Sequence, residues 1–325
     1  MRNSAYSGNL GFVIALILMS AMTLMSYFSV IPAPEQESHG FLFAFEPWRI
    51  PRPVSVIARW LLIVAISVGM VLVNRRYNFI PTLTTLHASV FMILCAADPG
   101  MSRGIGPGIL FAVVNLVALF LLFKAFRHGG KPSESASAIF LIALFCSSGS
   151  MFQYAFVFLI PLYAICAAMM KIFRFREVGA LVIGTATPYW IFFGLKDMSF
   201  PGFRLPEFVP FSVAPGMDNA IFMIYVSSLA VIGFLLSMKN IYSLLSSNLQ
   251  LRMLGRGMIL TGIGVSALFM IDASLVAVFA VAVYMFTSFQ TGYLSGFSRQ
   301  RGSGWILSIT FLFSLTFLIL MLNGL

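Results

Sequence analysis

Hydrophobic residues in this chain fall into long runs separated by short polar breaks, and these runs indicate its architecture. A helix needs about 20 mainly apolar residues to cross a bilayer. The runs predict eleven such helices, at 10–31, 57–73, 79–96, 106–126, 136–149, 151–170, 178–195, 219–238, 257–271, 273–293 and 304–322. The expected fold is therefore all-α: a polytopic bundle of transmembrane helices that forms a single transmembrane domain over residues 1–325.

Two of the hydrophobic runs are long, and charge indicates that each contains two helices. The run 137–170 has basic residues just beyond both ends, and so does the run 257–293. A single helix in either place would put one basic cluster outside the cytoplasm, against the usual retention of Lys and Arg there. We therefore divide the first run at residues 147–150 and the second at Asp272.

Charge also predicts the orientation in the membrane. Of the 20 basic residues, 14 fall on the face that holds only two of the ten acids, Glu134 and Glu177. Short loops rich in Lys and Arg stay in the cytoplasm. This places the N-terminus inside and the C-terminus outside, with extracytoplasmic loops at 32–56 and 196–218. The inner segment 239–256 is rich in leucine and predicts an amphipathic helix on the inner leaflet.

Composition excludes several classes of protein. With 60% hydrophobic and 9% charged residues, the chain has too little polar sequence to cover a soluble globule, and we expect a multi-pass protein of the bacterial inner membrane. The net charge of +10 is spread along the ends of the runs, so it indicates topology and lipid contacts rather than nucleic-acid binding. No nucleotide-binding motif is present. His87 lies within a predicted helix, and His39 and His128 lie in loops on opposite faces of the membrane, so the three cannot bind one metal. We therefore expect no metal and no cofactor.

The most specific constellation is the segment Asp98-Pro99-Gly100-Met101-Ser102-Arg103-Gly104. Asp followed by Pro-Gly is typical of a plain turn. The same residues also combine an acid, an arginine and a glycine-rich backbone that can approach a ligand closely. An arginine beside exposed amides suits a phosphate, which it can bind with two hydrogen bonds. The sequence leaves both interpretations open.

Other ionisable residues in or near the apolar runs are candidates as well. Asp272 has no polar flank, which is unfavourable beside hydrocarbon and suggests a function, although an N-cap of the next helix would also explain it. His87 lies in mid-helix about 16 Å from Asp98, as part of a proton relay or as a hydrogen-bonded interhelical residue. The outer arginines either pair with outer acids or bind an anionic lipid-linked substrate; they include Arg49, Arg59, Arg103 and Arg204.

The segment 171–189 carries a family resemblance. It has a basic turn ending in Arg176-Glu177, followed by a helix with Gly184 and Thr187-Pro188-Tyr189. This pattern resembles an uncharacterised family of multi-pass inner-membrane proteins of Bacteroidota, which has no assigned activity. The general architecture is similar to membrane glycosyltransferases that use polyprenyl-phosphate sugars, usually with acids in the first outer loop. Glu46 lies in that loop here, but the adjacent acidic pair of such enzymes is absent.

These observations together predict a protein that handles a lipid-linked saccharide or another anionic envelope lipid at an outward-facing site, as a glycosyltransferase or polymerase. The candidate catalytic acids are Asp98, Glu46 and Asp272. The candidate substrate-binding residues are Arg103, Arg59, Arg49, Arg204 and His87. The alternatives are a transporter or flippase and a non-catalytic subunit of an envelope assembly complex. An enzyme would open outward around Asp98, whereas a transporter would have broken helices and polar groups at the midplane, near His87, Asn115 or Gln153.

Overall fold

The structure is a computed structural model that describes residues 9–28, 41, 51–78, 80, 85–102, 104–127, 132–195, 217–245, 249–271, 275–297 and 302–322. These residues form α-helices and short 3₁₀ turns, without a strand. The α-helices are α1 (Asn9–Phe28), α2 (Arg52–Tyr77), α3 (Leu86–Ala96), α4 (Pro107–Arg127), α5 (Pro132–Ser150), α6 (Leu159–Met169), α7 (Phe175–Leu195), α8 (Met217–Leu245), α9 (Leu249–Ile271), α10 (Val276–Phe297) and α11 (Gly302–Leu322). Each of the eleven predicted runs overlaps one of these helices, which confirms the all-helical bundle.

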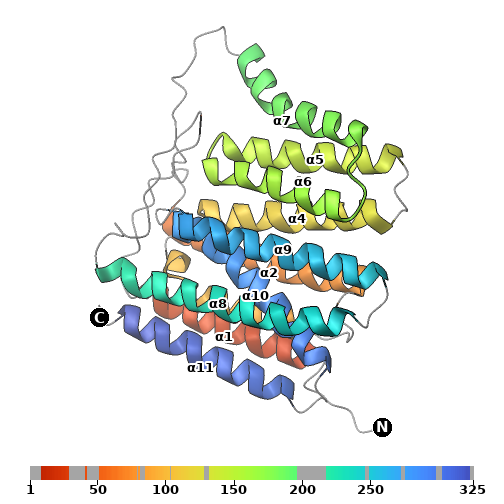
Figure 1. The fold of residues 1–325 in the computed structure, drawn as a ribbon. Coiled ribbons are helices and arrows are strands. Elements are labelled where there is room, and N and C mark those ends of the chain that lie inside the picture. The colour runs from red at the N-terminus through yellow and green to blue at the C-terminus, as the bar shows by residue number, and fades with distance from the viewer. Residues whose placement is uncertain are drawn as a thin grey trace.

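The helices lie roughly along one direction (Figure 1), and α3 and α10 are the most buried of them. Every residue of α3 is buried. In α10, 89% of the most apolar stretch is buried, against 17% in α11 at the periphery. α10 packs against α3, α4, α8 and α9. α3 and α10 are therefore enclosed by other helices, while α11 leaves most of its apolar surface exposed.

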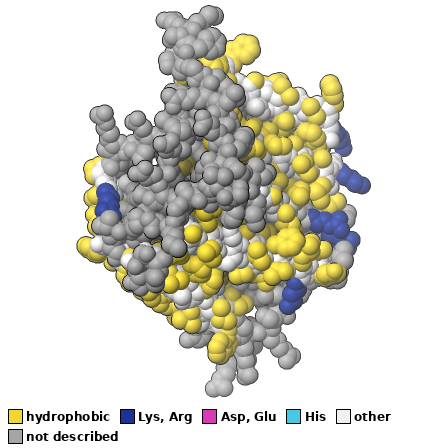
Figure 2. Space-filling model, turned by 60° about the vertical axis from the view of Figure 1, so that its left-hand side comes forward, with side chains coloured by type: hydrophobic (Ala, Val, Ile, Leu, Met, Phe, Trp, Pro, Cys, Tyr) yellow, Lys and Arg dark blue, Asp and Glu magenta, His cyan; other side chains and the backbone are white. Residues whose placement is uncertain are grey.

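Seven helices among the described residues are long and apolar enough to cross a membrane: α1, α2, α4, α8, α9, α10 and α11. Large apolar side chains also point outward, and Trp190 and Trp305 are 79% and 74% exposed. Hydrophobic side chains spread over the visible face, and the basic ones lie toward its edges (Figure 2). An apolar surface of this extent is unfavourable in water and typical of a protein surrounded by lipid.

Several hydroxyl groups within the apolar helices are satisfied by their own backbone. Thr23 donates to the carbonyl oxygen of Met19 at 2.7 Å, and Ser67 to that of Ile63 at 2.8 Å. A hydroxyl that bonds to the carbonyl four residues earlier leaves no polar group facing hydrocarbon. These residues are therefore compatible with membrane helices.

Both predicted divisions of the long runs are confirmed. α5 and α6 are separate helices, and so are α9 and α10. Ser135 at the start of α5 contacts Glu177 at the start of α7, so the chain crosses the bundle twice between them. Gly262 of α9 packs directly on the ring of Phe286 in α10, as expected for two helices joined by a short turn.

Several boundaries differ from the predictions. The third run was expected to span from residue 79, but α3 begins at Leu86 and has 11 residues, about 16 Å of helix. The serine-rich stretch 147–150 was expected to be the outer turn, but it is the last turn of α5, and the chain leaves the helix only at 151–153. Serine side chains can bond to nearby carbonyls, as Ser150 does to Ser147, so they need not end a helix.

The loops around two other helices also differ. The loop predicted at 32–56 ends earlier than expected, because α2 begins at Arg52; the loop 196–218 lies mostly outside the described residues. No separate amphipathic helix occupies 239–256, since α8 continues to Leu245 and α9 begins at Leu249. Leu244 and Leu254 are buried, and Leu244 contacts Gly255. The leucines of this segment therefore join two bundle helices.

Candidate functional site

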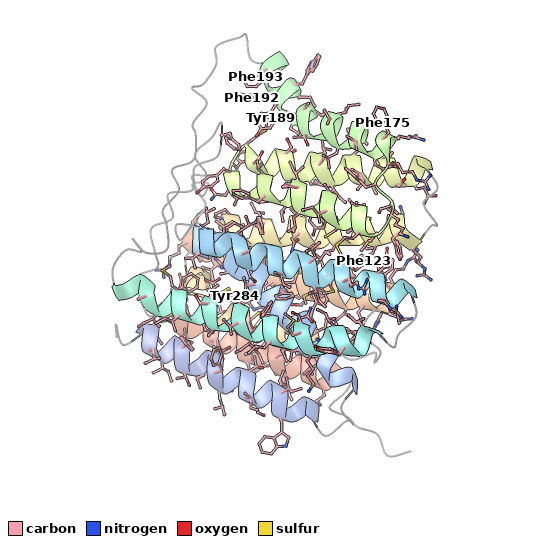
Figure 3. The ribbon with its side chains drawn as sticks, viewed as in Figure 1. Phe123, Phe175, Tyr189, Phe192, Phe193 and Tyr284 are labelled. Carbon is pink, nitrogen blue, oxygen red and sulfur yellow. The ribbon has the colours of Figure 1, made fainter. Side chains whose placement is uncertain are left out.

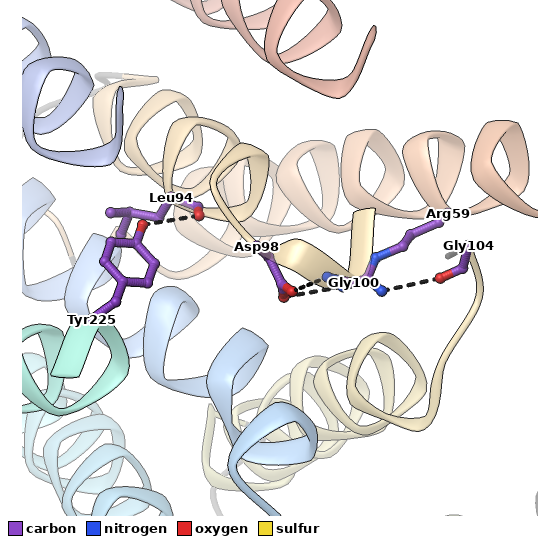
Figure 4. Close-up of polar contacts among 6 residues, drawn as sticks. All are labelled: Arg59, Leu94, Asp98, Gly100, Gly104 and Tyr225. Atoms are coloured by element: carbon purple, nitrogen blue, oxygen red, sulfur yellow. Dashed lines mark hydrogen bonds and ion pairs between the residues drawn. The ribbon is translucent and has the colours of Figure 1, made fainter. Parts of the chain in front are cut away.

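A buried ion pair joins α2 to the turn that follows α3. Arg59 donates from Nη2 to Oδ2 of Asp98 at 3.0 Å, and from Nη1 to the carbonyl oxygen of Gly104 at 3.0 Å. The backbone N–H of Gly100 donates to the other carboxylate oxygen, Oδ1, at 2.7 Å (Figure 4). The side chains of Arg59 and Asp98 are only 8% and 4% exposed. Arg59 lies about 10 Å from the start of α2, so both charges lie inside the bundle.

Two glycines let the turn close around the guanidinium of Arg59. A Cβ atom on Gly100 would lie 2.5 Å from Nη1 of Arg59. Gly104 has a φ of +98°, and a side chain there would overlap Ser55. Ser55 Oγ accepts the N–H of Ile105 at 2.9 Å and fixes the end of the turn. The backbone thus approaches a cation of the protein itself, whereas the sequence left open both a plain turn and a close approach to a ligand.

The pKa of the Asp98 carboxyl reflects opposing effects. Burial raises this pKa above its ordinary value, while the charge of Arg59 and the N–H of Gly100 act to lower it. The rise prevails. Asp98 is therefore more readily protonated than an exposed aspartate, even though it has a cationic partner.

Tyrosines from two further helices reach the same region. The Tyr225 hydroxyl of α8 donates to the carbonyl oxygen of Leu94, one turn before Asp98, at 3.1 Å (Figure 4). It also lies 3.4 Å from Ser314 Oγ of α11. The ring of Tyr284 in α10 is 5.7 Å from that of Tyr225, inside the bundle (Figure 3). The region around Asp98 is therefore built from α2, α3, α8, α10 and α11.

The sequence interpretation did not identify Tyr225 and Tyr284, because single tyrosines in apolar runs are usually packing residues. One signal was available for α10. The polar residues of this helix lie on several of its faces, although it is predicted to cross hydrocarbon. Such a distribution indicates that other helices surround it on all sides. These polar residues include Tyr284, Thr287, Ser288, Gln290 and Thr291.

His87 does not join this site. It lies in the first turn of α3, at the opposite end of that helix from Asp98, and is fully buried. Its ring stacks on Phe289 of α10, with ring centroids 5.7 Å apart. Gly292 allows this close approach, since a Cβ there would lie 2.7 Å from Cβ of His87. The contacts of His87 are thus interhelical. The other candidates lie outside the described residues: Glu46, Asp272, Arg49, Arg103 and Arg204.

The segment that carries the family resemblance packs against α5, and we call this interface between α5 and α7 the seam. Gly184 brings the helices together, since a Cβ there would lie 2.6 Å from the carbonyl oxygen of Phe140. Ser147 donates to the carbonyl oxygen of Thr185 at 2.6 Å, and Ser150 and Tyr189 join their hydroxyls at 2.6 Å. Figure 3 shows Tyr189 on α7 and Phe175 at the start of that helix.

The start of the same seam depends on Glu177. Its Oε1 accepts the hydroxyl of Ser135 at 2.5 Å, and its Oε2 accepts the N–H of Arg174 at 3.1 Å. The second contact is half of a capping box, in which a carboxylate in the first turn satisfies an N–H at the helix start. The residues of the pattern that the structure describes therefore join and cap helices.

Comparison with known proteins gives no assignment: no family model, no curated protein and no solved structure matches this chain. The chemistry of the site is therefore the basis on which a function can be assigned.

Proposed function

We propose that this protein is a carrier or flippase for an anionic envelope lipid, such as a polyprenyl-phosphate-linked saccharide, in the bacterial inner membrane. One observation carries the proposal: the Arg59–Asp98 ion pair is buried inside the bundle, at the end of a helix too short to cross a bilayer. Charged groups in such positions usually mark a substrate or ion pathway. Interrupted helices with binding groups near the midplane are typical of transporters.

Further polar groups inside the bundle support a carrier. Asn115 lies in the middle of α4, and its Oδ1 accepts the Tyr163 hydroxyl at 2.6 Å. Gln153 is buried where the chain passes from α5 into the 3₁₀ turn Tyr154–Phe158 before α6. Both positions, and the break beside Gln153, fit the pattern expected of a transporter. Among the described residues, these polar groups are distributed along the bundle.

The contacts of Asp98 also fit a carrier. In this structure one carboxylate oxygen of Asp98 binds Arg59 and the other binds Gly100. A carrier can use such a pair as an element that opens when the substrate arrives.

The basic ends of the helices support an orientation with the N-terminus in the cytoplasm. Arg76 at the end of α2 meets Arg127 at the end of α4, whose Nη1 donates to the Arg76 carbonyl oxygen at 2.6 Å. Arg75 and Lys124 lie at these same helix ends. Such a concentration of positive charge is typical of the cytoplasmic side. The resemblance to inner-membrane proteins of Bacteroidota agrees with this location.

A flipping assay tests the proposal. The purified protein is placed in liposomes with fluorescent phosphatidylglycerol or a fluorescent prenyl phosphate, and dithionite quenches the label in the outer leaflet. We expect the wild type to expose inner-leaflet label within minutes and Arg59→Ala to be slow. The matched control is Arg52→Ala, which removes an exposed arginine from the same helix. Rates equal to those of protein-free liposomes for both anionic probes would overturn the proposal, and a new covalent glycan product would replace it with the transferase.

A further inference from the structure

Two buried hydrogen-bond donors beside the ion pair have no hydrogen-bond partner within the described residues. They are Nε of Arg59 and the hydroxyl of Tyr284. Arg59 is 6% exposed and Tyr284 is fully buried. A donor buried without an acceptor is unfavourable by several kcal/mol in an apolar interior, so it indicates strain or a place where a polar partner binds.

Both donors lie near Asp98, which pairs with Arg59 and acts electrostatically on the Tyr284 hydroxyl. Asp98 and Arg59 are the charged groups that act on the Tyr284 hydroxyl from nearby. The ring of Tyr284 packs on Tyr225, whose hydroxyl binds Leu94 in the last turn before Asp98. The open donors of α2 and α10 therefore lie in one region of the bundle interior.

The geometry of the ion pair explains why Nε is open. Nε and Nη2 share one edge of the guanidinium, and a carboxylate can bind that edge with both oxygens. Asp98 contacts it with Oδ2 alone, because Oδ1 accepts the N–H of Gly100. Nη1 binds the carbonyl of Gly104 and anchors Arg59 from the other side. If Asp98 took up a proton and released Nη2, the whole Nε–Nη2 edge would be available while Arg59 stayed in place.

We infer that this edge of Arg59, together with the Tyr284 hydroxyl, binds a monoanionic phosphodiester, and that the anion enters with one proton on Asp98. The inference rests on the proposed function and names its substrate class. Before binding, Arg59 and the Asp98 carboxylate sum to zero charge. Afterwards Asp98 is neutral and the anion balances Arg59, so the sum is again zero. Since an uncompensated charge is highly unfavourable in this interior, a doubly charged phosphomonoester would be rejected.

Of the titratable groups that the structure describes around Asp98, only Asp98 itself ordinarily titrates below neutral pH, so we assign the proton to it. Among the described residues, the other groups are Arg59 on α2, Cys95 on α3, Tyr225 on α8 and Tyr284 on α10. A thiol, phenols and a guanidinium ordinarily titrate above neutral pH. Burial raises the pKa of Asp98 above its ordinary value.

Calorimetry counts the protons taken up with the anion. The purified protein in detergent is titrated with dihexanoyl phosphatidylglycerol, a soluble phosphodiester, in buffers of different ionisation enthalpy between pH 6 and 8. We expect about one proton per bound anion and a Kd that rises about tenfold per pH unit. Asp98→Asn should bind with no proton uptake and no pH dependence. Binding by the wild type without proton uptake would overturn the coupling, even if the flipping assay succeeds.

Two tyrosine variants test the second donor. Tyr284→Phe keeps the packed ring and should weaken binding about tenfold, with the proton count unchanged. Tyr163→Phe also removes a buried hydroxyl, at Asn115, and should bind like the wild type. Unchanged binding by Tyr284→Phe would overturn its role and leave that hydroxyl to a buried water. Dimethyl phosphate and inorganic phosphate identify the source of the anion: binding of dimethyl phosphate as tight as that of the lipid would overturn the lipid headgroup as ligand. Melting temperatures establish that each variant is folded.

Discussion

Nη2 of Arg59 lies 3.0 Å from Oδ2 of Asp98, and this contact connects residues that are 39 positions apart in the chain. It fixes the turn after α3 against α2. Both charges are removed from water, so their mutual attraction and their bonds to Gly100 and Gly104 must offset the loss of hydration. The pair is consequently sensitive to the loss of either partner.

We predict that Asp98→Ala and Arg59→Ala each destabilise the folded protein by about 3–5 kcal/mol. Asp98→Ala leaves the buried charge of Arg59 uncompensated, and Arg59→Ala leaves the carboxylate of Asp98 and the carbonyl oxygen of Gly104 without this donor. Replacing both residues together by apolar residues of similar volume should cost less than the sum of the single changes. The measurement is unfolding in mixed detergent micelles with increasing SDS. Single variants as stable as the wild type would show that the pair does not hold the turn in the folded protein.

We predict opposite effects for two glycines of α7. In Gly184→Ala, the new methyl would lie 2.6 Å from the carbonyl oxygen of Phe140 and force α5 and α7 apart, with a loss of about 1–3 kcal/mol. Gly179 has no atom within 4 Å of such a methyl, so Gly179→Ala should be neutral or stabilising by up to about 1 kcal/mol through helix propensity. Thermal unfolding in detergent compares the two. Equal shifts would contradict the close contact at Gly184.

The helices could be predicted from the sequence because their signal is strong and local. Apolar runs of sufficient length allow hardly any alternative to a membrane helix, and charge parity correctly divided each of the two long runs into two helices, although α5 continues through 147–150. The ends of helices were less predictable. The start of α3 at Leu86 depends on packing by neighbouring helices, and hydropathy carries no information about such contacts.

The candidate site was predictable only in part. Asp98 was identified, since an acid beside Gly100 between two apolar runs is unusual, and Arg59 was recognised as an arginine that needs a partner. Their pairing was one of several possibilities, because the sequence does not show which outer acid meets which outer arginine. Tyr284 could not be identified from the sequence either. It lies beside the ion pair because α10 packs against α3, and a sequence does not show which helices pack together.

We predict that the bond between Ser135 and Glu177 contributes to stability in a pH-dependent way. Burial raises the pKa of Glu177, but the hydrogen bonds from Ser135 and from the N–H of Arg174 outweigh it, so the pKa lies below its ordinary value of 4.5. A lowered folded-state pKa stabilises the protein above the unfolded value, and the contribution is lost as the pH falls through the folded value. Ser135→Ala should therefore lose about 1.5–3 kcal/mol at pH 7 and less at pH 3.

Melting temperatures of the wild type, Ser135→Ala and Glu177→Gln between pH 7 and pH 3 check this prediction. Glu177→Gln keeps the shape of the side chain but removes its charge, so its melting temperature should change less with pH than that of the wild type. A gap between the wild type and Ser135→Ala that stays constant down to pH 3 would refute the role of the ionised carboxylate.

We predict that the end of the bundle where Arg76 meets Arg127 faces the cytoplasm, since basic residues are retained on that side. The three native cysteines are buried, so their replacement gives a background without accessible thiols. On that background, Gly40→Cys and Pro210→Cys should react with a membrane-impermeant thiol reagent in intact spheroplasts, and Gly129→Cys should react only after lysis. Labelling of Gly129→Cys alone in intact spheroplasts would invert the orientation and move the entry side of the proposed anion site to the cytoplasm.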